Sequence, residues 1–441
     1  MIFERVALHD LMAWKNQVNR KPLVLNGARQ VGKTHLLKAF GKAAFKNTAY
    51  FNFEEQPLLK QFFENNKDVE GIIDNLSLVN GSTIEKEKTL IIFDEIQECN
   101  EALNSLKYFN ENAPQYAIVA AGSLLGITLS KPQSFPVGMV SFLQIYPLSF
   151  IEFLEATKPN LKNYIVDLSN LNAIPNLFFE EILQLFKKYL ICGGMPEAAK
   201  DFVENNNIER CKKILNDIIN SYRYDFSKHA ATKDVAKINF IWNSIPSQLS
   251  RENKKFLYQT VKEGARAREY EDALQWLQLS GLLYKVNRIE KPHFPISSYE
   301  DLAAFKIYLF DIGILRELAK LEPVFLEEPN AMFKEFKGSF TENYVLQSLV
   351  MQFGEIPKYW ASEHKAEIDF VIQYKNEIIP IEVKSDENVK GKSLTIYEQK
   401  YNPKLRIRYS LKNLQYKDGL LNIPLFLADR TKEFIDMVLN N

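Results

Sequence analysis

The segment GARQVGKT, residues 27–34, constrains the fold of this chain more than any other feature. It follows the apolar run PLVLN and precedes HLLKAFGKA, so a strand, a glycine-containing loop and a helix are expected in that order. The glycines let main-chain N–H groups turn inward, and the N-terminus of the helix adds a partial positive charge. The pattern therefore predicts a cradle in which the main chain holds a chain of phosphates.

The side chains of this loop suit a nucleoside triphosphate with a metal ion. Lys33 is expected to reach the β- and γ-phosphates, and the Thr34 hydroxyl is expected to ligate Mg²⁺. A glycine turn that merely starts a helix is the structural alternative. The expected nucleotide contacts come from Gly27, Ala28, Arg29, Gln30, Val31, Gly32, Lys33, Thr34 and His35.

An acidic pair follows a second apolar strand. TLIIFDEIQ contains Asp94 and Glu95; the aspartate can hold Mg²⁺ through its water shell, and the glutamate can orient or deprotonate the attacking water. A third strand, YAIVAAG, leads into Ser123, whose hydroxyl is a candidate sensor of the γ-phosphate. Together with the loop, these strand ends indicate a module that binds ATP and Mg²⁺, with Lys33 and Glu95 as catalytic residues.

The order of apolar segments predicts an α/β fold with several domains. Up to residue 155, short strands alternate with helices, which is typical of a parallel sheet covered on both faces. Residues 156–235 are expected to form a helical subdomain, broken at Gly193. Residues 236–310 show the order helix, helix, helix, strand, which resembles a winged helix, and Gly281 ends its last helix. A final α/β unit is expected over residues 311–441.

The segment EIDFVIQYKNEIIPIEVKS, residues 367–385, carries a second group of candidate site residues. Asp369 lies in one expected strand, whereas Glu382 and Lys384 lie two residues apart, and hence on one face, in the next. Two carboxylates and a lysine near strand ends can hold a divalent metal against a phosphate. The alternative is a simple ion pair between Glu382 and Lys384 on the solvent side of the sheet.

Several motifs together resemble one known family. GARQVGKT, DEIQ, GSLLG, PLSFIEFL, GGMPEAA, YEDALQWLQLSGLLYKV, YLFDIGIL and IPIEVKS look like the AAA-type ATPases of the archaeal-ATPase-like group. The resemblance covers nearly the whole chain. It implies a P-loop ATPase core that binds ATP through Gly32, Lys33 and Thr34, with Asp94 and Glu95 as the acidic motif.

One departure from that family concerns the source of an arginine at the nucleotide. Where relatives often have Gly-Arg just before PLSF, this chain has Gly138 and Met139. The resemblance therefore implies no arginine acting in cis from that position. Arg29, inside the loop, is an available cation or else one partner of a structural salt bridge.

The same resemblance extends to the C-terminal part. In this group the C-terminal domain, of uncharacterised function, is related to PD-(D/E)XK nucleases, whose carboxylates bind Mg²⁺ or Mn²⁺ and whose lysine steadies the nucleophile. Asp369 and Glu382 fit metal binding, and Lys384 fits the catalytic lysine. Glu342, in FKGSFTENYVLQSL, fits the helical glutamate that often completes such a site. The fold can also persist with its metal site unused.

Charged residues near the expected winged helix bear on macromolecular partners. A winged helix presents a helix to DNA with basic residues nearby on phosphates. Glu269, Glu271 and Asp272 would repel phosphate, which favours docking of a protein partner. DNA or a protein is thus the expected partner, and a homo-oligomer is a further option. The basic residues in question are Arg251, Lys254, Lys255, Lys262, Arg266 and Arg268.

The bulk composition fits a cytoplasmic protein without a membrane partner. Lys+Arg and Asp+Glu both number 55, so no net charge draws the whole chain to nucleic acid or to a bilayer. The three cysteines lack a CxxC spacing, which fits a reducing compartment. The N-terminal stretch MIFERVALHDLMAWKNQ has no apolar signal core.

Three functional hypotheses follow. The main one is a Mg²⁺-dependent ATPase that acts as a switch or motor coupled to a nuclease-like C-terminal domain, in DNA transactions. The second is a metal-dependent nuclease regulated by ATP. The third is a nucleotide-gated interaction or scaffold protein with little turnover. ATP turnover with and without DNA, together with DNA cleavage assays, separates the three.

Overall fold

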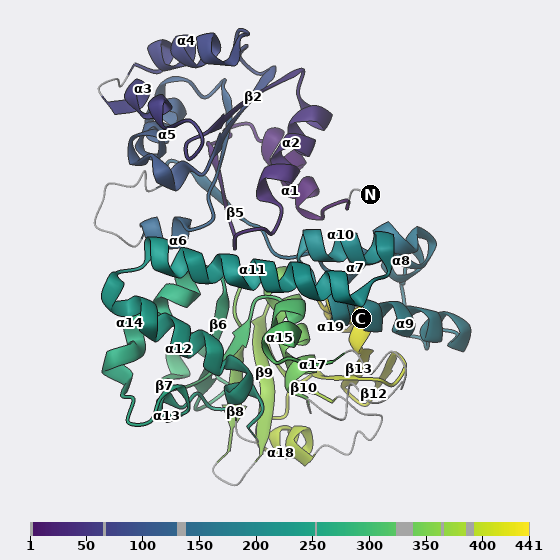
Figure 1. The fold of residues 1–441 in the computed structure, drawn as a ribbon. Helices are drawn as coiled ribbons and strands as arrows, with labels where there is room; N and C mark the ends of the chain where they lie inside the picture. The colour runs from purple at the N-terminus through teal and green to yellow at the C-terminus, as the bar shows by residue number, and fades with distance from the viewer. Residues whose placement is uncertain are drawn as a thin grey trace. The chain divides into compact units, whose positions relative to one another are not determined.

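The chain folds into two units, each around its own β-sheet (Figure 1). The N-terminal unit consists of Glu4–Pro147 with the short segment Leu279–Gly281, and the C-terminal unit contains Leu148–Gln278 and Leu282–Asn441. The computed structural model describes residues 3–64, 68–129, 138–251, 254–322, 338–362, 366–384 and 392–440. The finer domain boundaries expected at residues 155, 235 and 310 stay predictions.

Strands and helices alternate along the N-terminal unit. Its strands are β1 (Leu23–Asn26), β2 (Asn47–Asn52), β3 (Thr89–Asp94), β4 (Ala117–Ala121) and β5 (Ser141–Gln144). Its helices are α1 (Ala7–Lys15), α2 (Lys33–Ala44), α3 (Gln61–Glu64), α4 (Val69–Asn80), α5 (Asn100–Asn112) and α6 (Leu125–Leu129), with short 3-10 helices η1 (Pro57–Lys60) and η2 (Ile96–Glu98). The three apolar runs expected as strands, PLVLN, TLIIFDEIQ and YAIVAAG, are confirmed as β1, β3 and β4.

The sheet of the N-terminal unit is wholly parallel, in the order β2-β3-β4-β1-β5. The pairing aligns Asn52 with Asp94 and Leu25 with Ala121, so the strands end at one common edge. The loops that follow β1, β3 and β4 therefore meet there, which is where open α/β sheets bind ligands.

Helices cover both faces of this sheet. On one face, Phe93 of β3 packs in a core with Ile72 of α4 and Leu106 of α5. Leu90 lies three residues before Phe93 and so points to the opposite face. There Gly41 of α2 lies so close that a Cβ on it would be 3.4 Å from the Leu90 side chain. The expected parallel sheet with helices on both faces is confirmed.

The C-terminal unit begins with helices and continues into a large sheet. Its helices are α7 (Phe150–Thr157), α8 (Pro159–Val166), α9 (Asn176–Cys192), α10 (Pro196–Asn205), α11 (Ile208–His229), α12 (Thr232–Leu249), α13 (Tyr258–Val261), α14 (Ala267–Leu279), α15 (Ile312–Leu318), α17 (Ser339–Phe353), α18 (Lys392–Tyr401) and α19 (Thr431–Leu439). Its strands are β6 (Leu283–Ile289), β7 (Glu300–Leu309), β8 (Lys358–Ala361), β9 (Glu367–Tyr374), β10 (Glu377–Val383), β11 (Arg406–Ser410), β12 (Gln415–Lys417) and β13 (Leu420–Pro424). The 3-10 helices are η3 (Ile296–Tyr299) and η5 (Leu425–Arg430).

The two helix ends that the sequence predicts at glycines are present in this unit. α9 ends before Gly193, which has φ = +68°, and α14 ends shortly before Gly281, which has φ = +75°. Such left-handed backbone favours glycine, because a Cβ would be strained there. Among the helices of the described residues, none combines the length and the apolar character needed to cross a bilayer.

The strands of the C-terminal unit form one mixed sheet in the order β12-β13-β11-β10-β9-β8-β6-β7. β6 and β7 form an antiparallel hairpin after α12, α13 and α14, and β6 also pairs in parallel with β8. The hairpin is thus built into the large sheet. The expected order of three helices and a strand is present, whereas the winged-helix assignment stays a prediction.

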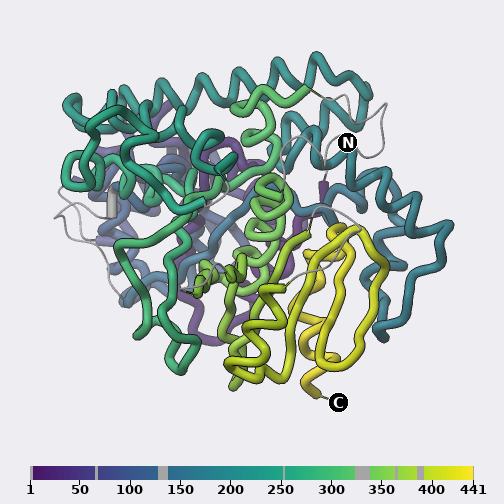
Figure 2. The backbone as a smooth tube through the Cα atoms, turned by 90° about the horizontal axis from the view of Figure 1, so that it is seen from below, coloured from purple at the N-terminus to yellow at the C-terminus, as the bar shows by residue number. Residues whose placement is uncertain are grey.

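The middle of this sheet positions the second group of candidate residues. β9 and β10 are antiparallel, with Phe370 opposite Ile381, and β10, β11 and β13 run parallel to one another. The strands from β11 to β13 lie side by side in yellow (Figure 2). Since Phe370 faces Ile381 across the ladder, Asp369 lies next to the end of β10 that carries Glu382.

Candidate functional site

The loop between β1 and α2 has a backbone that requires glycine at two positions. Gly27 has φ = +152°, and a Cβ on it would lie 2.3 Å from the carbonyl oxygen of Ile145. Gly32, with φ = +91°, immediately precedes α2. Because neither position suits an L side chain, the loop can curl tightly ahead of the helix. The expected strand, loop and helix are therefore present.

Lys33, the first residue of α2, turns back over this loop. Its side chain is buried, and its ammonium group donates hydrogen bonds to the carbonyl oxygens of Gly27 at 2.8 Å and Ala28 at 2.9 Å. Burial lowers the pKa of Lys33 to about 8, against the opposing effect of the Glu95 and Asp94 carboxylates. The loop thus contains a cation held by main-chain oxygens.

Asp94, at the end of β3, accepts hydrogen bonds from three directions. The Thr34 hydroxyl donates to Oδ2 at 2.7 Å, and the Tyr50 hydroxyl donates to the same oxygen at 2.8 Å. The main-chain N–H of Glu95 donates to Oδ1 at 3.1 Å. Mg²⁺ prefers oxygen ligands. The Thr34 hydroxyl and the Asp94 carboxylate lie close together and supply such oxygens, so these two residues fit a Mg²⁺ site.

Glu95 lies just beyond β3 in a left-handed conformation, with φ = +49° and ψ = +45°. Its Oε2 accepts a hydrogen bond from Nε2 of Gln97 at 2.5 Å and one from the Ser123 hydroxyl at 3.3 Å. The structure thereby brings the ends of β3 and β4 together through side chains. Ser123, expected near the nucleotide, contacts the expected catalytic glutamate directly.

The other residues of the predicted nucleotide contact set have mixed surroundings. Ala28 and Val31 are buried, whereas Gln30 and His35 are exposed. Arg29 forms an ion pair with Glu54 at 3.9 Å. A structural salt bridge is the alternative role that the sequence analysis gives for this arginine.

Three residues of this site escaped the sequence reasoning. Arg5 donates from its guanidinium to the carbonyl oxygens of Val31, at 2.8 Å, and Tyr146, at 2.6 Å. Tyr50 reaches Asp94 because β2 is the neighbour of β3 in the sheet. Gln97 is the last residue of the DEIQ motif, so its place in that motif is a sequence signal that could have identified it.

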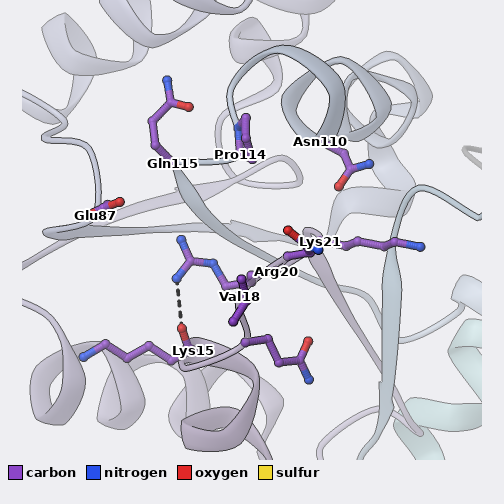
Figure 3. A pocket seen from close by; sticks show the side chains of 10 residues that line it. Lys15, Val18, Arg20, Lys21, Glu87, Asn110, Pro114 and Gln115 are labelled. Atoms are coloured by element: carbon purple, nitrogen blue, oxygen red, sulfur yellow. Dashed lines mark hydrogen bonds between the residues drawn. The ribbon is translucent and has the colours of Figure 1, made fainter.

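A pocket of about 640 Å³ lies at the other edge of the same sheet (Figure 3). Its lining includes Lys21, Glu87 and Gln115, which precede β1, β3 and β4 respectively. It therefore lies at the amino ends of the parallel strands, whereas the phosphate loop follows the carboxyl end of β1. Arg20 in this pocket donates a hydrogen bond to the carbonyl oxygen of Lys15 at 3.2 Å. The pocket is separate from the phosphate loop.

In the C-terminal unit, β9 and β10 bring the predicted residues together. Oδ2 of Asp369 accepts a hydrogen bond from the main-chain N–H of Val383 at 2.8 Å. Glu382 is buried, and its Oε1 lies 2.8 Å from the ammonium nitrogen of Lys384. The ion pair that the sequence offered as an alternative is therefore present, but its carboxylate is buried and does not lie on a solvent-facing side of the sheet.

Glu342, on α17, is buried, and its negative charge is compensated by a neighbouring lysine. It forms an ion pair with Lys254 and accepts a hydrogen bond from the Tyr308 hydroxyl at 3.1 Å. Burial alone would raise the pKa of Glu342, but the ammonium groups of Lys254 and Lys306 lower it. Lys254, predicted as part of a basic patch, is thus a partner of an interior carboxylate.

Two further charges complete this interior cluster. Lys306, on β7, is fully buried and forms an ion pair with Glu367. Burial, reinforced by the Glu342 carboxylate, raises the pKa of Asp369 to about 7. Within the described ranges, no three His, Cys, Asp or Glu side chains are grouped so that they could hold a metal ion. Of the carboxylates predicted as metal ligands in this unit, Glu342 and Glu382 each form an ion pair with a lysine, and Asp369 accepts a main-chain hydrogen bond.

Comparison with known families identifies the domain that carries the phosphate loop. Residues 19–154 match a family model described as AAA domain. This part of the chain is an AAA domain. The match includes the phosphate loop, Asp94, Glu95 and Ser123, so the ATPase class expected from the motifs is confirmed for this domain. The roles of the individual residues stay predictions.

Two further parts of the chain match family models of unknown function. Residues 183–324 match the domain of unknown function DUF8612, and residues 337–427 match the domain of unknown function DUF4143. Neither description names a nuclease or a winged helix. Among curated proteins, none matches the sequence at a significant level.

Solved structures give partial overlaps. A Walker-type ATPase of Pyrococcus abyssi is 14% identical, with a TM-score of 0.45 over 72% of this chain and 96% of that one. The Aeropyrum pernix Orc1 protein in complex with DNA is 11% identical, with a TM-score of 0.29 over 73% and 93%. Drosophila ORC bound to DNA is 12% identical, with a TM-score of 0.27 over 71% and 94%. All three TM-scores are below 0.5, so the family match alone identifies the domain.

Proposed function

We propose that the AAA domain binds ATP with Mg²⁺, hydrolyses it, and thereby acts as a switch or motor on the C-terminal unit. The hydrogen bond of 2.7 Å between Thr34 and Asp94 is the observation that carries this proposal. It joins a residue of the phosphate loop to the acidic strand end, 60 residues further along the chain. An ordinary glycine turn before a helix gives no reason for such a contact.

Each residue has a distinct part in this proposal. Main-chain N–H groups between Gly27 and Thr34 bind the phosphates, aided by the N-terminus of α2. The Lys33 ammonium exchanges two carbonyl partners for phosphate oxygens, which are stronger acceptors because they are charged. Mg²⁺, when bound, neutralises charge that develops on the phosphates. Glu95 orients or deprotonates the attacking water.

The decisive test is the variant Lys33→Ala. Losing charge-assisted hydrogen bonds to phosphate, worth about 1.5–3 kcal/mol, should weaken binding of a fluorescent ATP analogue about 10- to 100-fold. Lys42→Ala is the matched control, because Lys42 is exposed on the same helix. Equal ATP affinity in the Lys33 variant and the parent, with both folded by circular dichroism, would contradict the proposal.

A metal-dependent nuclease regulated by ATP is the second candidate. It is favoured by the contact between β9 and β10 that places Asp369 beside the strand end with Glu382 and Lys384. Incubation with plasmid and single-stranded DNA in Mg²⁺ or Mn²⁺ tests it. Cleavage that Lys384→Ala abolishes and the exposed-site control Lys417→Ala keeps would support the nuclease. No cleavage in any metal would support a binding or scaffold role.

The third candidate, a nucleotide-gated scaffold, differs in rate rather than in affinity. It predicts ATP binding that depends on Lys33 together with very slow turnover, unchanged by DNA. An AAA-type motor acting on DNA predicts turnover that rises when DNA is added. Measuring both on the full chain and on Glu95→Gln separates the two.

A further inference from the structure

Gln97 occupies a slot next to Glu95, the proposed base of ATP hydrolysis. It lies in η2, two residues after Glu95, and its Nε2 donates to Oε2 of Glu95 at 2.5 Å. This is the shortest of the hydrogen bonds reported above for Glu95, Asp94 and Lys33. An amide donor to a carboxylate is a charge-assisted bond, so it restrains the carboxylate more than a neutral pair would.

The neighbouring strand end is shaped to admit this amide. Gly122, just after β4, faces Gln97 so closely that a Cβ would lie 2.3 Å from Oε1 of Gln97 and 2.7 Å from the Leu125 side chain. Gly122 is not needed for a left-handed turn, because its φ is not among the positive ones. The close approach of the glutamine therefore gives a physical reason for glycine at this position.

The hydrogen bond from Nε2 of Gln97 to Glu95 leaves the other polar atom of the Gln97 side chain, Oε1, without a partner among the described residues. Oε1 of Gln97 is buried. An unsatisfied buried acceptor is unfavourable by about 1–3 kcal/mol, so the slot would suit an apolar side chain of the same length better if packing were its only purpose. The arrangement is explained when the amide is there to hold the carboxylate.

We propose that Gln97 is a positioning residue for ATP hydrolysis, which aims the Glu95 carboxylate at the attacking water. This rests on the proposed function of the AAA domain. Glu95 has a left-handed backbone, and its Oε2 is shared by Gln97 and Ser123. If Ser123 turns toward a nucleotide, Gln97 is the donor that keeps the carboxylate in place. Gln97 then affects the rate of hydrolysis and not the affinity for ATP.

The variant Gln97→Met keeps the length of the side chain and removes the amide. We expect kcat to fall on the order of 10- to 100-fold, as for a misaimed catalytic group, with an unchanged Kd for ATP. Gly122→Ala should lower kcat in the same way, because its methyl group displaces the Gln97 amide. Gln61→Met, at an exposed position of α3, is the matched control.

A double-mutant cycle separates positioning from mere structural support. If Gln97 acts only by positioning the Glu95 carboxylate, it has no effect once that carboxylate is replaced. Adding Gln97→Met to Glu95→Gln should therefore not lower the single-turnover rate further. A lower rate in the double variant, a weakened Kd, or an unchanged kcat in Gln97→Met would each overturn the inference. If Glu95→Gln itself leaves hydrolysis unchanged, the proposed function fails instead.

Discussion

The carboxylates of the AAA domain and those of the C-terminal unit have different neighbours. Asp94 accepts hydrogen bonds from the hydroxyl groups of Thr34 and Tyr50, which carry no charge. Glu342 forms a buried ion pair with Lys254. A cation that approaches Asp94 displaces neutral donors, at a small net loss per hydrogen bond. A cation that approaches Glu342 must displace Lys254, 13% exposed, from a carboxylate that is only 4% exposed, which is far more costly.

The comparison teaches that residue type and position in the sequence alone do not determine which groups surround a carboxylate. Glu382 and Lys384 repeat the arrangement, since the lysine lies 2.8 Å from the carboxylate it would share with a metal. The C-terminal cluster thus satisfies most of its charge internally, whereas the AAA site leaves a carboxylate and an ammonium group with exchangeable partners. Three experiments can break or sharpen this contrast.

The largest effect is expected from Lys254→Ala. Removing one partner of a buried ion pair leaves an uncompensated charge on Glu342, so the free energy of unfolding should fall by about 3–5 kcal/mol. Chemical denaturation of the full chain measures this. Adding Glu342→Gln to the variant should restore part of the loss, because the orphaned charge disappears.

Lys233→Ala, at an exposed position of α12, is the control for that experiment. A surface lysine should change the free energy of unfolding by less than about 0.5 kcal/mol. If Lys254→Ala is no worse than this control, the C-terminal carboxylates are not held by their lysines. The contrast with the AAA site would then be wrong.

An intermediate effect is expected from the dependence of the free energy of unfolding on pH. The pKa of Asp369 is raised to about 7 by burial and by the Glu342 carboxylate, compared with about 3.9 in an unfolded chain. Between these values the native state keeps a proton that the unfolded state releases. The stability contributed by this group is therefore lost as pH rises from about 4 to about 7, with a limiting slope of about 1.4 kcal/mol per pH unit.

Asp369→Asn removes one proton from the difference between the native and unfolded states, so the free energy of unfolding should depend less steeply on pH. Denaturant unfolding at a series of pH values measures this slope. Asp311 and Asp429, whose pKa values burial raises to about 6, titrate in the same direction and form the background that persists in the variant. Asp418→Asn, at an exposed position, should leave the slope as it is. An identical slope in the Asp369 variant and the parent would show that the carboxyl ionises normally.

The smallest effect is expected from Tyr50→Phe in the AAA domain. It removes one of two hydroxyl donors to Asp94, so the free energy of unfolding should fall by about 1 kcal/mol. Binding of Mg²⁺ with ATP should persist, because Thr34 still lies at the carboxylate. Tyr224→Phe is the control, since Tyr224 is 76% exposed. A loss as large as that of Lys254→Ala would remove the distinction between the two clusters.

Much of the AAA domain could be predicted from the sequence. The positions of β1, α2, β3 and β4 follow from short apolar runs and from the glycines of residues 27–34, whose conformational needs are local. Asp94, Glu95 and Ser123 belong to one predicted site because each follows or ends an apolar strand downstream of the phosphate loop. The structure places Asp94 with Thr34, and Glu95 with Ser123.

The partners of these groups could not be predicted in the same way. Tyr50 reaches Asp94 only because β2 pairs with β3, and Lys254 reaches Glu342 across 88 residues of chain. The strand expected after the three helices of the winged-helix-like region is β6, which forms a hairpin with β7 and also pairs with β8 in the large sheet.

The sequence by itself determined the phosphate loop, the strand ends that face it and the positions of the C-terminal carboxylates. Those features depend on residues close together in the chain, through backbone conformation and side-chain alternation. Only the tertiary structure decided which carboxylates meet hydroxyl groups and which meet lysines. That choice depends on strand order and register, because a carboxylate's neighbours are set by the elements packed around it and not by the residues beside it in sequence.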